Sequence, residues 1–273
     1  MTAAAHDWLD MRLPVDDEAR RHALPLLDKA AARLIGPVTV IDIGAGTGNS
    51  ALWFDRHLRP RLDGREINWV LLDADADSLG VASRALPEAT TVTAPITSLP
   101  DVAAEHLRGE SASGHLLVTC SAVCDVLTPA DVDVVAQTLH RFGGMGLFLL
   151  SITDEWSLSP VDPRDEAIGS AFAAHQQREG RLGAEGGAAM AAAGRRIGAE
   201  VTSSASPWQL DAPDDSEFIS RFLMERVEAA VEEAPGLRDA ADEWLSVRLE
   251  QAKVDLSVVV DHLDVFIDAG RRG

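Results

Sequence analysis

Hydrophobic residues in this chain form short continuous runs that alternate with segments of helical periodicity. The runs are rich in β-branched residues and typical of strands buried on both faces, and they lie at 38–43, 66–73, 90–93, 115–120 and 146–152. The segments with helical spacing lie between them, at 49–59, 75–86, 97–107 and 129–142. This alternation predicts a doubly wound parallel sheet with helices on both faces, joined by right-handed crossovers.

The last third of the chain departs from this rhythm. Its pattern predicts a helix at 187–198, a strand at 200–208 and helices over 214–253. A last strand is expected from 256 to 260, or as far as 266. The order of strand, helix and strand indicates an antiparallel closing pair. We therefore expect an α/β, Rossmann-like, mostly parallel seven-stranded sheet with an antiparallel closing strand and helical insertions.

The length of the chain suits one large α/β domain or two small ones, and we interpret residues 1–273 as a single domain. Three parts of it are expected to cover the site or to add helices: N-terminal cap helices at 1–36, and insertions at 153–187 and 211–253. Within the first part, Pro14 is expected to begin a helix that breaks or kinks at Pro25. Residues 1–13 could form a lid over the site or dock on the core, and the sequence favours neither.

The first strand ends in an acid that is followed by glycines at every second position. This stretch runs from Asp42 to Gly48, and the next predicted helix begins at Asn49. A strand, a tight glycine turn and a helix N-terminus together make a site for an adenosine-type ligand. The spacing Asp-x-Gly-x-Gly-x-Gly differs from the Gly-x-Gly-x-x-Gly of nicotinamide and flavin enzymes, which disfavours a nicotinamide-dependent oxidoreductase.

A second acid, Asp73, stands at the end of the second predicted strand. The carboxyl ends of parallel strands line one crevice, so Asp42, Asp73, the turn at 94–97 and Ser121 should converge there. An acid at this position can accept hydrogen bonds from both hydroxyls of a ribose. Asp73 could also cap the following helix, and the two roles are compatible.

The segments Val40–Asn49 and Leu71–Leu79 resemble the class I S-adenosylmethionine-dependent methyltransferases, small-molecule type, and the expected strand order extends this resemblance to most of the chain. The resemblance implies that the glycine turn lies against the methionine part of the cofactor and that Asp73 holds the ribose. The residues expected to bind S-adenosyl-L-methionine are Asp42, Gly44, Ala45, Gly46, Asn49, Asp73, Ala74, Pro95, Ile96 and Ser121.

One part of the family pattern is missing. The family often places an acid and an apolar residue beside the adenine, after the third strand, whereas this chain has Thr93-Ala94-Pro95-Ile96-Thr97-Ser98. Either Thr97 or Ser98, or the backbone alone, would then contact the adenine amino group.

The sequence says less about the residues that would bind the methyl acceptor. Methyl transfer needs the acceptor held in line with an already activated methyl group and shielded from water, and a base helps if the acceptor must lose a proton. The candidate bases are His175 and Asp125; the candidate acceptor-binding residues are Arg12, Gln176, Trp156 and Trp208. A surface position for His175 and core packing for Trp208 are the alternatives. His262 is expected to be structural.

The charge of the chain disfavours some classes of binding partner. With 24 Lys and Arg against 44 Asp and Glu, the net charge is -20, which repels nucleic acid and anionic membranes. The Cys-x₃-Cys spacing of Cys120 and Cys124 is interpreted as two reduced apolar residues, with no metal site. The chain lacks a signal-peptide pattern and a run long enough to span a membrane, so we expect a soluble, cytoplasmic protein. The sequence does not decide between a monomer and a homodimer.

The leading hypothesis is therefore methyl transfer from S-adenosylmethionine to a small-molecule acceptor, with no role for nucleic acid or membrane. The alternative is a catalytically inactive, methyltransferase-like fold that binds the cofactor or serves as a partner subunit. An active enzyme needs a pocket beside the methyl group, and the alternative does not.

Overall fold

The computed structural model describes residues 6–107 and 115–270, and within these ranges eight strands form one sheet. The order across the sheet is β3-β2-β1-β4-β5-β8-β6, and β7 also pairs with β8. The strands are β1 (Val38–Ile43), β2 (Ile67–Asp73), β3 (Thr90–Thr93), β4 (His115–Ser121), β5 (Met145–Ser159), β6 (Glu200–Ala205), β7 (Trp208–Asp211) and β8 (Ser257–Asp268). Strands β1 to β5 are parallel, and β8 is antiparallel to its neighbours. The mostly parallel, Rossmann-like sheet with an antiparallel closing strand is thus confirmed.

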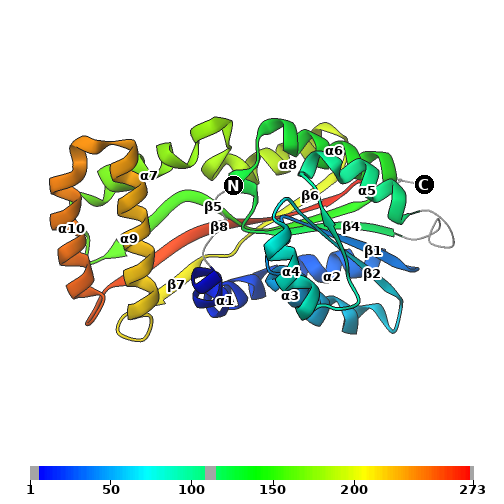
Figure 1. The fold of residues 1–273 in the computed structure, drawn as a ribbon, viewed down its shortest axis with the longest axis horizontal. Coiled ribbons are helices and arrows are strands. Elements are labelled where there is room, and N and C mark those ends of the chain that lie inside the picture. Colours follow the sequence, from blue (N-terminus) through cyan, green and yellow to red (C-terminus); the bar gives the residue numbers. More distant parts are fainter. Residues whose placement is uncertain (1–5, 108–114, 271–273) are drawn as a thin grey trace.

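Helices cover both faces of this sheet (Figure 1). One face carries α1 (His6–Arg20), α2 (Leu24–Arg33), α3 (Asn49–Leu58) and α4 (Ala76–Ala85); the other carries α5 (Leu99–His106), α6 (Pro129–Phe142) and α8 (Gly186–Arg196). Successive residues of the central strands alternate between the two cores: Val40 packs in the first, Ile41 in the second. Both faces are buried, which explains the continuous hydrophobic runs.

The last strands differ in detail from the prediction. The expected strand at 200–208 is two strands, β6 and β7, separated at Ser206-Pro207, which gives eight strands instead of seven. Strand β5 continues to Ser159, so the start of the expected insertion at 153–187 is strand. Its partner β8 is equally extended and pairs with it from Met145↔Asp268 to Ser159↔Ser257.

Three further helices surround the far ends of β5 and β8, to the left in Figure 1. They are α7 (Asp165–Gln176), α9 (Ser216–Glu233) and α10 (Arg238–Gln251). The side chain of Arg248 on α10 ties them to β5: it donates to both carboxylate oxygens of Asp165 (2.6 and 2.7 Å) and to the carbonyl oxygen of Pro160 (2.6 Å). Trp244 Nε1 also donates to Asp165 (2.7 Å).

The prediction that Pro14 begins the N-terminal helix was wrong. Helix α1 already includes His6 and continues through Pro14 to Arg20. The flanking Met11 and Val15 pack against the core, and this packing outweighs the hydrogen bond lost at proline. The expected break at Pro25 is present as a 3₁₀ turn at Arg21–Ala23, after which Pro25 lies in the first turn of α2.

Part of the expected lid, residues 1–5, lies outside the described residues. The rest docks on the helices: the ring of Trp8 stacks on Phe218 of α9, with 5.1 Å between ring centroids. Cys120 and Cys124 are free and buried. No helix within 6–107 or 115–270 is long and apolar enough to cross a membrane.

Candidate functional site

The glycine turn between β1 and α3 is left-handed at each of its glycines. The φ angles are 62° at Gly44, 53° at Gly46 and 87° at Gly48, a region that side chains rarely adopt. A Cβ added to Gly48 would lie 3.2 Å from the backbone of Ala82 on α4, so this glycine allows close helix packing. A Cβ added to Gly46 would meet nothing within 4 Å. The turn therefore presents its backbone to open space at Gly46.

Asp73 fixes the turn to the end of β2. Its Oδ2 accepts a hydrogen bond from the Gly46 N–H (2.8 Å), and its Oδ1 accepts one from the Asp75 N–H (2.8 Å). The cap of α4 is Asp75, which accepts from the backbone of Asp77 at 3.0 Å. Asp73 therefore does not cap α4. Its carboxylate lies next to Gly46 and can accept further hydrogen bonds.

Asp42 lies beneath the turn and is fully buried. Its Oδ1 accepts from Thr119 Oγ1 (2.7 Å) and Ser50 Oγ (3.3 Å), while its Oδ2 has no hydrogen-bond partner among the described atoms. Burial raises the pKa of this carboxyl to about 7, against the lowering effect of these bonds and of Arg20. We therefore expect Asp42 to stabilise the base of the turn through its buried hydrogen bonds to Thr119 and Ser50.

The other predicted cofactor residues follow the carboxyl ends of the parallel strands. Ala45 is in the turn itself, Asn49 begins α3, Ala74 follows β2, Pro95 and Ile96 follow β3, and Ser121 ends β4. Helix α1 is tied to this edge of the sheet, because Arg20 Nε donates to Ser121 Oγ (3.1 Å). The structure thus brings these residues to one edge, as the topology of a parallel sheet requires.

The loop after β4 connects the glycine turn with a cavity. A Cβ on Gly44 would lie 2.8 Å from Val123 Cγ2, so the Val123 side chain packs directly against the turn. The preceding residue, Ala122, lines the cavity and has a left-handed backbone (φ 56°). Leu150, on the neighbouring strand β5, also lines the cavity and is left-handed (φ 53°). Non-glycine residues in this conformation are uncommon and concentrate at functional sites.

We call this space, of about 270 Å³, the inner cavity. It brings together Arg12, Asp125, Gln176 and Trp208, which are four of the six residues predicted for the acceptor side. Its other lining residues come from α1, the loop after β4, β5, α7, α9 and β8, and they are Trp8, Ala122, Leu150, Ile152, Phe172, Phe222, Glu225, Arg226, Ala229 and His262. The guanidinium of Arg12 lies over the Trp208 ring, 5.1 Å from its centroid.

Burial controls the charge of two residues in the inner cavity. It raises the pKa of the Asp125 carboxyl, so this group holds its proton to a higher pH than an exposed carboxyl does. It lowers the pKa of His262 to about 4, and the positive charge of Arg12 adds to this effect. The His262 imidazole is therefore neutral near pH 7, and its Nδ1 is buried without a partner within the described ranges.

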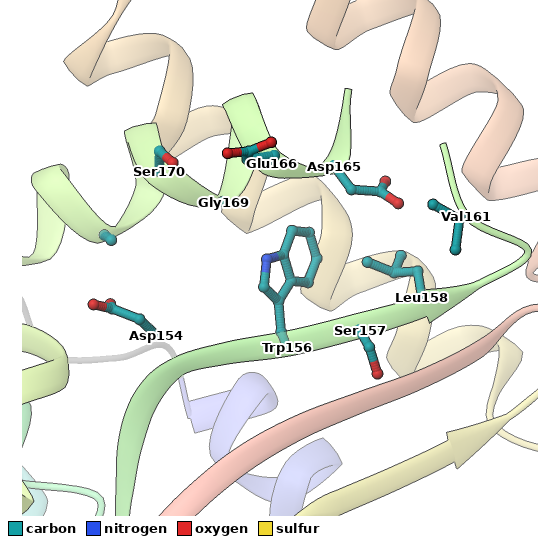
Figure 2. A pocket seen from close by; sticks show the side chains of 10 residues that line it. Asp154, Trp156, Ser157, Leu158, Val161, Asp165, Glu166, Gly169 and Ser170 are labelled. Atoms are coloured by element: carbon teal, nitrogen blue, oxygen red, sulfur yellow. The ribbon is translucent and has the colours of Figure 1, made fainter. Parts of the chain in front are cut away.

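Two predicted residues lie outside the inner cavity. His175 Nε2 faces Glu232 Oε2 on α9 at 3.4 Å. Trp156 lines a separate outer cavity of about 470 Å³, where its indole lies between β5 and the start of α7 (Figure 2). Asp154, Asp165 and Glu166 supply the acidic groups around that space.

Ten of the residues that line the inner cavity are not proposed from the sequence as acceptor-site candidates, and His262 and Arg226 are the two of these that matter most below. The sequence predicts a structural role for His262, and no role is proposed from the sequence for Arg226. A signal for Arg226 is present: it stands on the buried face of α9, four residues after Phe222 and four before Ala230. A lone cation at a core position of an amphipathic helix is rarely buried without a function or a partner.

Comparisons with known proteins agree with this architecture. No protein-family model matches the sequence, and no curated protein matches it. Among solved structures, YcgJ from Bacillus subtilis has a TM-score of 0.50 at 16% identity, covering 93% of this chain and 100% of its own. A candidate methyltransferase from Bacillus halodurans has a TM-score of 0.50 at 14% identity, covering 91% and 99%. A cyclopropane-fatty-acyl-phospholipid synthase-like protein from Lactobacillus casei has a TM-score of 0.52 at 12% identity, covering 93% and 92%.

This chain has the class I methyltransferase fold. At these identities the likeness concerns the fold, and the chemistry must be argued from the site itself. No group of three or more His, Cys, Asp or Glu side chains in the described part of the chain is arranged to hold a metal ion.

Proposed function

We propose that the protein transfers a methyl group from S-adenosylmethionine to a small molecule bound in the inner cavity. The observation that carries this proposal is the junction at 122–123, where Ala122 lines the inner cavity and Val123 packs against the glycine turn. A donor on the turn and an acceptor in the cavity would be neighbours. The inactive, methyltransferase-like alternative has no need of such a cavity.

The residues around the turn fit S-adenosylmethionine. The backbone at Gly46 faces open space, and Asp73 keeps lone pairs that can accept from ribose hydroxyls. When bound, this cofactor supplies a methyl group already activated on a sulfonium. Ser121, Pro95 and Ile96 would complete the walls of its site.

The remaining chemistry falls to the acceptor side. Arg12, Gln176 and Trp208 would orient the acceptor, while Trp8 and Phe222 from the covering helices exclude water from it. As the base for an acceptor that must lose a proton, we place Asp125 ahead of His175, because only Asp125 lines the inner cavity. Burial raises the Asp125 pKa toward the range in which a carboxylate accepts protons effectively.

Removing the carboxylate of Asp73 is expected to weaken cofactor binding. Asp73→Ala should reduce the affinity for S-adenosylmethionine by roughly 1–3 kcal/mol, the range for losing hydrogen bonds to a buried charged acceptor. Isothermal titration calorimetry with S-adenosylmethionine and S-adenosylhomocysteine measures this, with Asp77→Ala on the exposed face of α4 as the matched control. Unchanged affinity in Asp73→Ala would mean that the ribose partner is elsewhere, with Asp75 the next candidate.

The proposed reaction is tested by mass spectrometry. A metabolite extract is incubated with the protein and with cofactor that carries a deuterated methyl group, and a product with the labelled methyl group is expected. A protein that binds the cofactor and yields no labelled product would support the inactive alternative. Calorimetry that shows no binding of S-adenosylmethionine or S-adenosylhomocysteine would contradict the proposed function and an inactive cofactor-binding protein, and would leave the partner subunit.

A further inference from the structure

Arg226 on α9 is a buried cation without a counter-charge in contact with it. Its exposed fraction is 3%, and within 6–107 and 115–270 it makes no ion pair. Its Nε and Nη1 are buried and have no hydrogen-bond partner there. Buried N–H donors are almost always satisfied, and those of a charged group are the most costly to leave unpaired.

Aromatic rings surround this guanidinium, but they do not provide the oxygen or nitrogen acceptors that its N–H groups need. The Arg226 Cζ lies 4.0 Å from the centroid of Phe172, 4.4 Å from that of Trp156 and 4.8 Å from that of Phe222. The ring faces stabilise the positive charge and fix its plane. Asp154 acts on it electrostatically only at longer range. The pKa of Arg226 is lowered by burial to about 9, so the group is still a cation at neutral pH.

The other charges of the inner cavity are already engaged. Arg12 donates to Asp16 (2.9 Å), and Glu225 accepts from Arg221 (2.6 Å). Burial raises the pKa of Asp125, which is in any case an acid, and His262 is neutral near pH 7. Arg226 is therefore the lining cation that still lacks a partner in the part of the chain that the structure describes.

We propose that the acceptor is a small carboxylate whose anionic group binds Arg226 in the inner cavity. This rests on the proposed function and names the substrate class of the same site. Arginine binds carboxylates through charge-assisted, often paired hydrogen bonds. The nearby carboxyls of Asp125 and Glu225 favour a monoanion over a more highly charged phosphate. Phe172, Phe222 and Ile152 provide apolar walls for the body of the molecule.

The proposal is tested by binding, independently of methyl transfer. Benzoate, phenylacetate and hexanoate are titrated against their uncharged amides and against inorganic phosphate, and the fluorescence of Trp8 and Trp208 in the cavity wall reports binding. We expect at least one acid to bind ~10-fold or more tightly than its amide. In Arg226→Gln this acid should lose ~10- to 100-fold in affinity, as for a hydrogen bond to a charged group.

Two variants serve as comparisons. Arg196→Gln removes an exposed arginine of α8 that pairs with Asp133 and should leave carboxylate binding unchanged. Arg12→Gln should have a smaller effect than Arg226→Gln, because Arg12 is already bonded to Asp16. A larger effect at Arg12 would overturn the assignment to Arg226.

The comparison of acid with amide in the unmodified protein decides the ligand class even if Arg226→Gln fails to fold. Equal binding of acids and amides, or no binding of any acid, overturns the carboxylate assignment. Inorganic phosphate binding more tightly than every acid overturns it in favour of a phosphoryl group. Carboxylate binding that is lost in Arg226→Gln, without labelled methyl product, supports the carboxylate site at Arg226 and contradicts the proposed function, so the two failures are distinguishable.

Discussion

Arg248→Ala is expected to lower the free energy of unfolding by about 3–5 kcal/mol, the cost of breaking a buried charge pair from one side. The Arg248 side chain is 1% exposed, and it donates to both oxygens of Asp165 and to the Pro160 carbonyl. Alanine would remove the cationic partner of the Asp165 carboxylate, which would keep only the N–H donors of Trp244 and Asp162. It would also remove this donor to the Pro160 carbonyl and leave a void beneath α10. Urea unfolding followed by circular dichroism measures the change.

The matched control for this experiment is Arg238→Ala, at the exposed start of the same helix, which should change stability by less than about 0.5 kcal/mol. Pairing Arg248→Met with Asp165→Leu should restore part of the loss, because replacing both charges removes the unpaired carboxylate. A loss below about 1 kcal/mol in Arg248→Ala would show that solvent reaches Asp165 and replaces the guanidinium.

The glycine turn and the acids at the ends of β1 and β2 could be located from the sequence because their geometry is local. Strand, glycine turn and helix are consecutive, and parallel strands bring their carboxyl ends to one edge. Asp42 and Asp73 could therefore be placed at that edge from their positions alone. The partners that Asp73 holds, such as the Gly46 N–H, depend on the conformation of the turn and became visible only in the structure.

The acceptor side could not be derived in the same way, because it depends on how distant elements face each other. Strand β5 shifts register between Ile152 and Trp156, so counting alternate residues fails to predict which cavity Trp156 enters. On α7, Gln176 faces the inner cavity while its neighbour His175 faces α9, a difference set by helical phase. Arg226 joins them from α9, fifty residues further along the chain.

Asp42→Asn is expected to make the protein more stable at pH 8 and to leave its stability near pH 4 almost unchanged. The pKa of Asp42 rises from its ordinary 3.8 to about 7 in the folded protein, mainly because burial disfavours the charged form. A carboxyl with a higher pKa in the folded state binds its proton more tightly there. Its favourable contribution is therefore present below pH 4 and is lost as the pH rises through about 7. The full loss is about 4 kcal/mol.

The measurement is the free energy of unfolding of both proteins between pH 4 and 8, taken as a difference. Other buried carboxyls with raised pKa values, including that of Asp264 at about 6, are common to both and cancel. Asp77→Asn removes an equal charge from the exposed face of α4 and should give no such divergence. Parallel curves for Asp42→Asn and the unmodified protein would contradict the prediction. They would mean that Thr119, Ser50 and Arg20 hold the Asp42 carboxylate ionised beneath the turn.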